Sequence, residues 1–170
     1  MAQPLPRSGN SPVPLDQPLY NASFGQAIKR FFTKYATFSG RASRSEYWWA
    51  ALFNALVATV GSILLAISIV ATGNPQMDYE PDPENWRPAP LTVVLIVLLA
   101  AYSLAVLIPS IAIAVRRLHD ANYSGWFYLL SLIPGVGGLI ILIFMVLPSH
   151  PQGARFDARS SLPPAYPQAM

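Results

Sequence analysis

Three long stretches of the chain contain no charged residue, and they predict the main elements of the fold. These stretches are residues 47–71, 88–115 and 123–149. A helix needs about 20 apolar residues to cross the hydrocarbon core of a bilayer, so each stretch is long enough to span it. The pattern predicts an all-α, multi-pass membrane protein with three transmembrane helices at residues 47–71, 90–115 and 126–147.

The third stretch is interrupted near its middle by Pro134 and the glycines that follow it. A proline removes one helical hydrogen bond, and glycines loosen the turn around it. The third element is therefore either kinked or re-entrant at Pro134. A kinked helix crosses the membrane and leaves the C-terminus outside, whereas a re-entrant hairpin keeps both ends on one side. We favour the kinked crossing.

An amphipathic pattern precedes the first apolar stretch. Aromatic and aliphatic residues recur at helical spacing over residues 24–38, with Lys29, Arg30 and Lys34 at other positions. This pattern predicts an amphipathic interfacial helix that lies at the membrane surface. A soluble helix packed against a partner is the alternative. With this helix, the membrane domain covers residues 21–150.

Proline-rich segments bound the membrane domain on both sides. Residues 1–20 contain five prolines among polar residues and predict a disordered tail, without the apolar stretch of a signal peptide. Residues 151–170 contain four prolines and are expected to form a flexible tail.

Basic and acidic residues are distributed unevenly along the chain. Residues 1–46 hold six basic and two acidic residues, whereas the loop of residues 72–89 holds four acidic residues and Arg87 alone. Arg116 and Arg117 follow the second stretch. Because basic residues favour the cytoplasmic side, the N-terminus is expected in the cytoplasm and the acidic loop outside.

The composition supports lipid as the main solvent and excludes several chemistries. Hydrophobic residues make up 53% of the chain and charged residues 11%, against about 25% charged in an average soluble domain. The absence of cysteine excludes disulfides, thiolate catalysis and Cys-ligated metals, and two histidines are too few for a histidine-rich metal site. No phosphate-binding loop or dinucleotide fingerprint is present, so no cofactor is expected. A net charge of +3 does not indicate a nucleic-acid partner.

Two charged groups flank the first two predicted spans, and the predicted orientation places both at the cytoplasmic face. We call them together the polar cluster; its members are Arg41, Arg44 and Glu46 before the first span, and Arg116, Arg117, His119 and Asp120 after the second. Aromatic residues of the kind that form membrane-interface belts occur at the ends of the stretches, namely Trp48, Trp49 and Trp126.

Three roles are open for the polar cluster. It can be the ordinary basic flank that contacts lipid head groups. Alternatively, Glu46 and Asp120 pair with arginines of the opposite group, with Arg44 as the partner of Asp120, and fix how the first two helices pack. In the third role the cluster binds an anionic head group, a phosphate or a partner protein, since a guanidinium can hold carboxylate or phosphate with two hydrogen bonds. Small residues on the first span also allow self-association.

Catalysis is not favoured by the sequence. His119 and Asp120 are adjacent, and neighbours on a helix do not face each other. Ser124 lies nearby, but the sequence shows no nucleophile elbow and no oxyanion hole. A transporter is expected to have ionisable groups in the middle of the membrane, and the three spans lack them. A non-catalytic membrane protein is the favoured interpretation. The alternative is a lipid- or envelope-related enzyme or transporter component that uses His119 and Asp120.

Two motifs resemble a bacterial inner-membrane family known as the domain of unknown function 805. The first, F-x-G-R-x-x-R-x-x-[FY]-W, is matched by Phe38, Gly40, Arg41, Arg44, Tyr47 and Trp48. The second, R-[RC]-L-H-D followed by S-G-W, is matched by Arg117, Leu118, His119, Asp120, Ser124, Gly125 and Trp126. The resemblance covers roughly residues 24–150 and implies a location in the bacterial inner membrane, but no activity. In the C-terminal tail, the chain keeps only Gly153, Phe156 and Asp157 of the family pattern.

Overall fold

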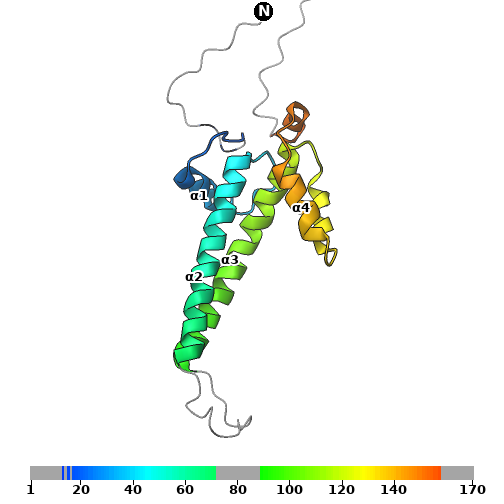
Figure 1. The fold of residues 1–170 in the computed structure, drawn as a ribbon. Helices are drawn as coiled ribbons and strands as arrows, with labels where there is room; N and C mark the ends of the chain where they lie inside the picture. The colour runs from blue at the N-terminus through cyan, green and yellow to red at the C-terminus, as the bar shows by residue number, and fades with distance from the viewer. Residues whose placement is uncertain (1–12, 14, 16, 72–88, 158–170) are drawn as a thin grey trace, which may run out of the picture.

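A long helical hairpin with smaller elements gathered at one of its ends makes up the structure (Figure 1). The computed structural model describes residues 13, 15, 17–71 and 89–157, and every regular element in these ranges is helical. The elements in chain order are α1 (Phe24–Thr33), α2 (Arg44–Ala71), α3 (Pro90–Asp120), the 3₁₀ helix η1 (Gly125–Leu132), α4 (Gly137–Val146) and the 3₁₀ helix η2 (Pro151–Phe156). We call the end of the hairpin at which α2 begins and α3 ends the cluster end.

Parts of the predicted organisation lie outside the described residues. These are most of the predicted tail of residues 1–20, almost all of the acidic loop of residues 72–89, and the chain after residue 157.

Helices α2 and α3 are the elements that the first two apolar stretches predicted. Among the described residues, they are the two helices long and apolar enough to cross a membrane, and only 6% of the most apolar window of each is buried. A core helix of a soluble domain would be mostly covered, so these outward-facing apolar surfaces fit a lipid environment. Helix α3 continues to Asp120, so the residues predicted as a loop after residue 115 form its last turn.

The third apolar stretch does not form a third long helix. It is divided into η1 and α4, and the chain reverses between them at Gly135, whose φ is +81°. Proline cannot continue the hydrogen-bond ladder of η1, and glycine accepts the left-handed conformation that the turn requires. The hairpin then returns to the end of α3. There the N–H of His150 donates to the carbonyl of Asp120 at 2.8 Å.

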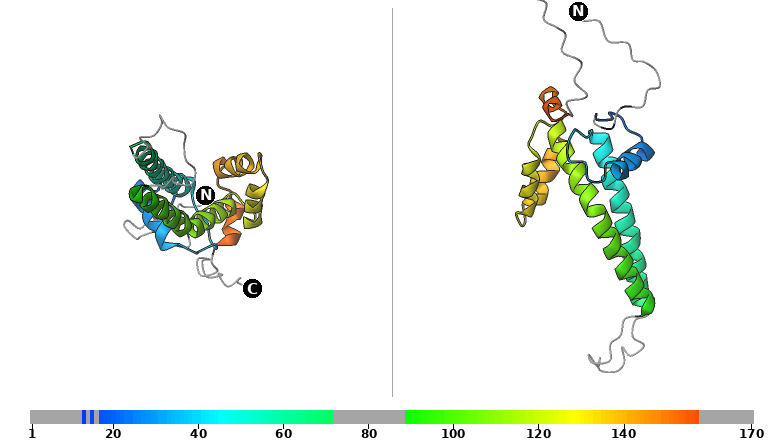
Figure 2. Two further views of the ribbon diagram at one scale, coloured as in Figure 1. Left: turned by 90° about the horizontal axis from the view of Figure 1, so that it is seen from below. Right: turned by 180° about the vertical axis from the view of Figure 1, so that it is seen from behind.

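The third stretch thus folds as the hairpin alternative rather than as one kinked helix, and it returns to the cluster end. Figure 2 shows η1 and α4 as two short neighbouring arms beside the upper part of α3. The arms approach so closely that a Cβ on Gly137 would meet the carbonyl of Leu130 and lie 2.8 Å from that of Ser131. Only glycine fits at this contact.

Helix α1 packs beside the first half of α2. It begins with a capping box between Ser23 and Gln26 and ends at Thr33, before the predicted limit of residue 38. Its inward face includes Arg30 and Lys34 as well as Phe31. Two of the three basic residues that the pattern placed apart from the apolar positions are therefore buried, and the next section gives the reason for Arg30.

Polar contacts join α2 to α3 along their length. The hydroxyls of Ser68 and Thr92 are 2.8 Å apart near the far end, and Tyr102 donates to Asn54 Oδ1 at 2.8 Å nearer the cluster end. Such interhelical hydrogen bonds help to fix the register of helices when lipid supplies no hydrophobic driving force.

Candidate functional site

The carboxylate of Asp120 is the meeting point of several segments at the cluster end. It is fully buried and accepts hydrogen bonds from Arg117 Nη1 at 2.9 Å, Ser149 Oγ at 2.5 Å and the Tyr20 hydroxyl at 3.1 Å. Arg41 Nη1 lies 4.0 Å away. One carboxylate thus connects the segment before α1, the loop before α2, the end of α3 and the segment after α4.

The buried carboxylate of Asp120 affects the pKa of Tyr20. Burial, and then the charge of Asp120, raise the pKa of Tyr20 above its ordinary value of 10.0. The phenol therefore stays protonated, which allows it to donate its hydrogen bond to Asp120.

Arg41 connects the loop before α2 to the end of the described chain. Its Nε and Nη2 donate to the two carboxylate oxygens of Asp157 at 2.8 and 2.6 Å. These hydrogen bonds raise the pKa of Arg41, even though burial opposes the shift. The N–H of Gly40 also donates to the carbonyl of Phe156 at 2.9 Å. Residues 151–157 were predicted to begin a flexible tail, but they form η2 and this two-pronged ion pair.

Arg117 attaches α4 to α3. Its side chain is fully buried, and its Nε donates to the carbonyl of Met145 at 3.3 Å, while Nη2 donates to the carbonyl of Leu147. The last carbonyls of a helix have no partner within the helix, so this arginine caps the end of α4. Its remaining donor, Nη1, is the one that pairs with Asp120.

Glu46, in the first turn of α2, forms a second buried centre. Its Oε1 lies 3.2 Å from Arg30 Nη1, and its Oε2 accepts from the backbone N–H groups of Ser43 and Leu19 at 2.9 and 3.1 Å. The Ser43 hydroxyl accepts from the N–H of Glu46 at 3.2 Å, so the two residues also make a capping box. Ion pairing with Glu46 explains why Arg30 faces inward.

The predicted pairing across the cluster is thus corrected in two places. Glu46 pairs with Arg30 of α1 rather than with an arginine at the end of α3. Arg44 is exposed and forms no ion pair or hydrogen bond within the described ranges, so it is not the partner of Asp120. Arg41 lies near Asp120 instead, because the loop before α2 carries it over the end of α3.

Arg116 is buried without a carboxylate at ion-pair distance in the described part of the chain. Its Nε donates to the carbonyl of Ala112, within α3, at 3.2 Å. Its backbone carbonyl accepts from the N–H of Ala42 at 3.0 Å, which fixes the loop before α2 on α3. Glu46 is close enough to attract the guanidinium electrostatically.

The side chains of His119 and Asp120 contact different partners. The Nδ1 of His119 lies 3.1 Å from the carbonyl oxygen of Gly40, and since a carbonyl only accepts, Nδ1 carries the proton. The imidazole stacks on the ring of Phe156 with a centroid distance of 4.1 Å and an angle of 5°. Both side chains therefore hold segments together rather than facing one another.

The sequence prediction missed several residues of the site. Tyr20 and Gln17 lie in the predicted disordered tail, and the Gln17 carbonyl accepts from Arg30 Nη2 at 2.9 Å. Ser149 was placed only at the end of an apolar stretch, and Asp157 was noted only as a trace of the family tail. The sequence offered one signal for these partners, namely an arginine with no acidic residue nearby in the sequence. If such an arginine is buried in the fold, its charge needs a carboxylate from a distant segment.

The predicted interface aromatics lie near the cluster end and are exposed. Trp48 and Trp49 are in the second turn of α2, and Trp126 at the start of η1 is 78% exposed. Their contact with a membrane interface stays a prediction. In the described ranges, no group of three or more His, Asp or Glu side chains could hold a metal ion.

Comparisons with known proteins agree with the two motifs. The family described as Protein of unknown function (DUF805) matches residues 35–158, which confirms the resemblance seen in the sequence. The chain is 36% identical over 110 residues to inner membrane protein YhaI of Escherichia coli (strain K12), an alignment that covers 65% of this chain and 74% of YhaI. It is 32% identical over 130 residues to inner membrane protein YhaH of the same strain, with 76% of this chain and 92% of YhaH covered. No solved structure matches.

Proposed function

The chain belongs to the family described as Protein of unknown function (DUF805), and from this premise we propose a role for its polar cluster. The protein is a non-catalytic, integral inner-membrane protein. Its polar cluster fastens three parts to one another at the cytoplasmic face: the long hairpin of α2 and α3 (the membrane hairpin), helix α1, and the hairpin of η1 and α4. The assembled face contacts lipid head groups or a partner protein.

The observation that carries the proposal is the set of donors around Asp120. Its two carboxylate oxygens accept hydrogen bonds from Tyr20, Arg117 and Ser149, which belong to three different parts of the chain. A buried carboxylate with this many donors is suited to fixing an arrangement of segments, because each donor is lost if its segment moves.

The proposed location and orientation rest on separate support. Both relatives in the comparison are named inner membrane proteins. The excess of basic residues before α2 and of acidic residues in the loop of residues 72–89 favours a cytoplasmic cluster end. The contacts of Tyr20 and Asp157 at this end support a proposed path in which the chain crosses the membrane twice and both flanking segments lie on the cytoplasmic side.

Helix α1 is proposed to lie in the membrane interface. It exposes Phe24 and Phe32 as well as Lys29, a combination that suits lipid tails and anionic head groups. The rings of Phe24 and Trp49 pack edge to face at a centroid distance of 5.7 Å, so aromatic side chains of α1 and α2 form one surface.

A double-mutant cycle on Arg41 and Asp120 tests the fastening role. Arg41→Gln and Asp120→Asn are each expected to destabilise the purified protein in detergent, with a coupling energy of at least about 0.5 kcal/mol, because they remove parts of one network. The matched cycle pairs Lys29→Gln, an exposed basic residue of α1, with Asp120→Asn, and additivity is expected there. Simple additivity in the Arg41 cycle would remove the proposed role.

A further inference from the structure

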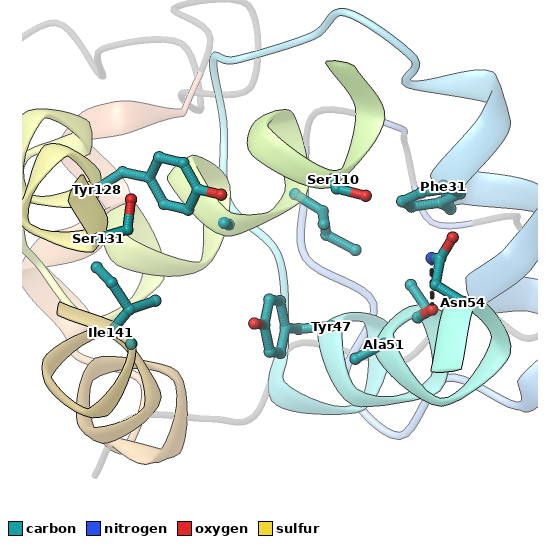
Figure 3. A pocket seen from close by; sticks show the side chains of 12 residues that line it. Phe31, Tyr47, Ala51, Asn54, Ser110, Tyr128, Ser131 and Ile141 are labelled. Atoms are coloured by element: carbon teal, nitrogen blue, oxygen red, sulfur yellow. Dashed lines mark hydrogen bonds between the residues drawn. The ribbon is translucent and has the colours of Figure 1, made fainter. Parts of the chain in front are cut away.

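A cavity of about 300 Å³ lies beside the cluster end, between the membrane hairpin and the η1–α4 hairpin. Figure 3 shows Tyr128 and Ser131 of η1 at the left, Tyr47 and Asn54 of α2 at the lower centre and right, and Ser110 of α3 above them. The rest of the lining is apolar. The cavity thus has a mixed wall, to which three elements contribute hydroxyl groups.

Four hydroxyl groups in this wall have no hydrogen-bond partner within the described ranges: those of Tyr47, Ser110, Tyr128 and Ser131. By contrast, Asn54 in the same wall is bonded both to the Ala50 carbonyl and to Tyr102. Water would satisfy such hydroxyls in a soluble protein. In lipid an unpaired hydroxyl costs free energy, so this step rests on the proposed membrane location.

Arg44 is the basic group nearest to the cavity along α2. It precedes Tyr47 by three residues, so the two side chains lie on the same face of the helix. Arg44 is exposed, and it is close enough to Arg117, which caps α4, for the two charges to repel each other. An exposed guanidinium, with no ion pair or hydrogen bond to the described residues, therefore lies one helical turn before Tyr47 of the cavity wall.

We infer that this cavity, together with Arg44 one helical turn before it on α2, binds one membrane phospholipid. The phosphate is held by Arg44, and the ester carbonyls below it accept hydrogen bonds from the hydroxyls of Tyr47 and Tyr128. The acyl chains leave between the hairpins into the bilayer. The order of groups fits, because Tyr47 lies about 4.5 Å deeper along α2 than Arg44, and the esters of a phospholipid lie deeper than its phosphate.

The chemistry of the wall favours a lipid over a free anion. Carbonyl oxygens accept hydrogen bonds and carry no charge, which suits neutral hydroxyl donors set among apolar side chains. A free phosphate would fill none of the apolar part of the cavity, whereas acyl chains would.

Native mass spectrometry of the full chain, delipidated and then mixed with phosphatidylglycerol, tests the inference. One retained lipid is expected for the wild type. Retention should fall about tenfold or more in Arg44→Gln, which loses a charge-assisted contact, and about fivefold or more in the double variant Tyr47→Phe/Tyr128→Phe. The matched controls are Lys29→Gln and Tyr123→Phe, whose side chains do not line the cavity, and both should retain the lipid.

Two outcomes would overturn the inference. Equal retention in the variants and the controls would identify the adduct as a non-specific annular lipid. Binding of inorganic phosphate that depends on Arg44 but not on the two tyrosines would identify an anion site instead. Neither result would affect the cycle on Arg41 and Asp120, so the phospholipid site and the fastening role can fail separately.

Discussion

The Tyr20 hydroxyl donates a hydrogen bond at 3.1 Å to Asp120, which lies 100 residues later in the chain. Tyr20 belongs to the segment before α1, and Asp120 is the last residue of α3. This contact brings the start of the described chain over the end of the second long helix. The proposed fastening role predicts that residues this far apart in sequence respond together to substitution.

Replacing Asp120 by Asn is expected to destabilise the protein strongly. The substitution leaves the fully buried Arg117 without its counter-charge, and removal of one partner of a buried pair costs roughly 3 kcal/mol or more. Unfolding in detergent, followed by circular dichroism, measures the change. Lys29→Gln is the control and should have little effect. A loss below about 0.5 kcal/mol would show that the buried pair is not needed for stability.

Replacing Gly153 by Ala is expected to detach η2 from the end of α3. The new Cβ would lie 2.6 Å from the carbonyl oxygen of His119 and 3.1 Å from that of Asp120, and these backbone atoms cannot move aside easily. A loss of about 1–3 kcal/mol follows from such overpacking. Hydrogen exchange at residues 151–157 should rise in this variant.

Gly25→Ala is the matched control for that substitution. No atom lies within 4 Å of the position that its Cβ would take. An unchanged or slightly raised stability is expected, since alanine is the better helix former. Equal behaviour of the two variants would contradict the close packing of η2 on α3.

The stability of the protein is expected to fall at high pH, partly through Tyr20. Because its pKa is raised in the folded state, the folded protein holds this proton more tightly than the unfolded chain does. This contribution is therefore complete below about pH 10 and is lost as the pH rises above that value. Unfolding midpoints between about pH 8 and pH 11 should decline less steeply in Tyr20→Phe than in the wild type. Parallel declines in the two proteins would exclude the predicted linkage.

Both ends of the membrane domain are expected on the cytoplasmic side. A fluorescent reporter fused after the C-terminal residue should be active in the cytoplasm, and a periplasmic reporter inserted in the loop of residues 72–89 should be active outside. A C-terminus in the periplasm would contradict the return of the chain through the η1–α4 hairpin.

Hydropathy alone predicted the elements whose own residues determine them. The stretches that form α2 and α3 are long and apolar, and this composition alone indicates helices in lipid. Their predicted positions agree with the structure to within a few residues. The third stretch has the same composition, but its outcome depends on whether the proline and glycines bend the chain or reverse it. That choice is decided by contacts such as the His150–Asp120 hydrogen bond, which hydropathy does not report.

The partners within the site were less predictable than its members. Most of the expected residues do gather at one end, because motifs that flank two antiparallel helices must meet there. The choice between Arg41 and Arg44 depends on a loop conformation, in which Gly40 has a φ of +79° and Ala42 is bonded to Arg116. Arg30 and Tyr20 come from segments that looked solvent-exposed, and only three-dimensional proximity reveals them.

The ion pair between Arg41 and Asp157 also sets an order of events during synthesis. Arg41 precedes the first long helix, and its carboxylate partner follows 116 residues later. Since a chain emerges from the ribosome N-terminus first, both long helices are made before that carboxylate exists. Membrane insertion of the hairpin can thus begin early, whereas its charged end is completed last. A nascent chain that stops before residue 157 leaves Arg41 without this partner.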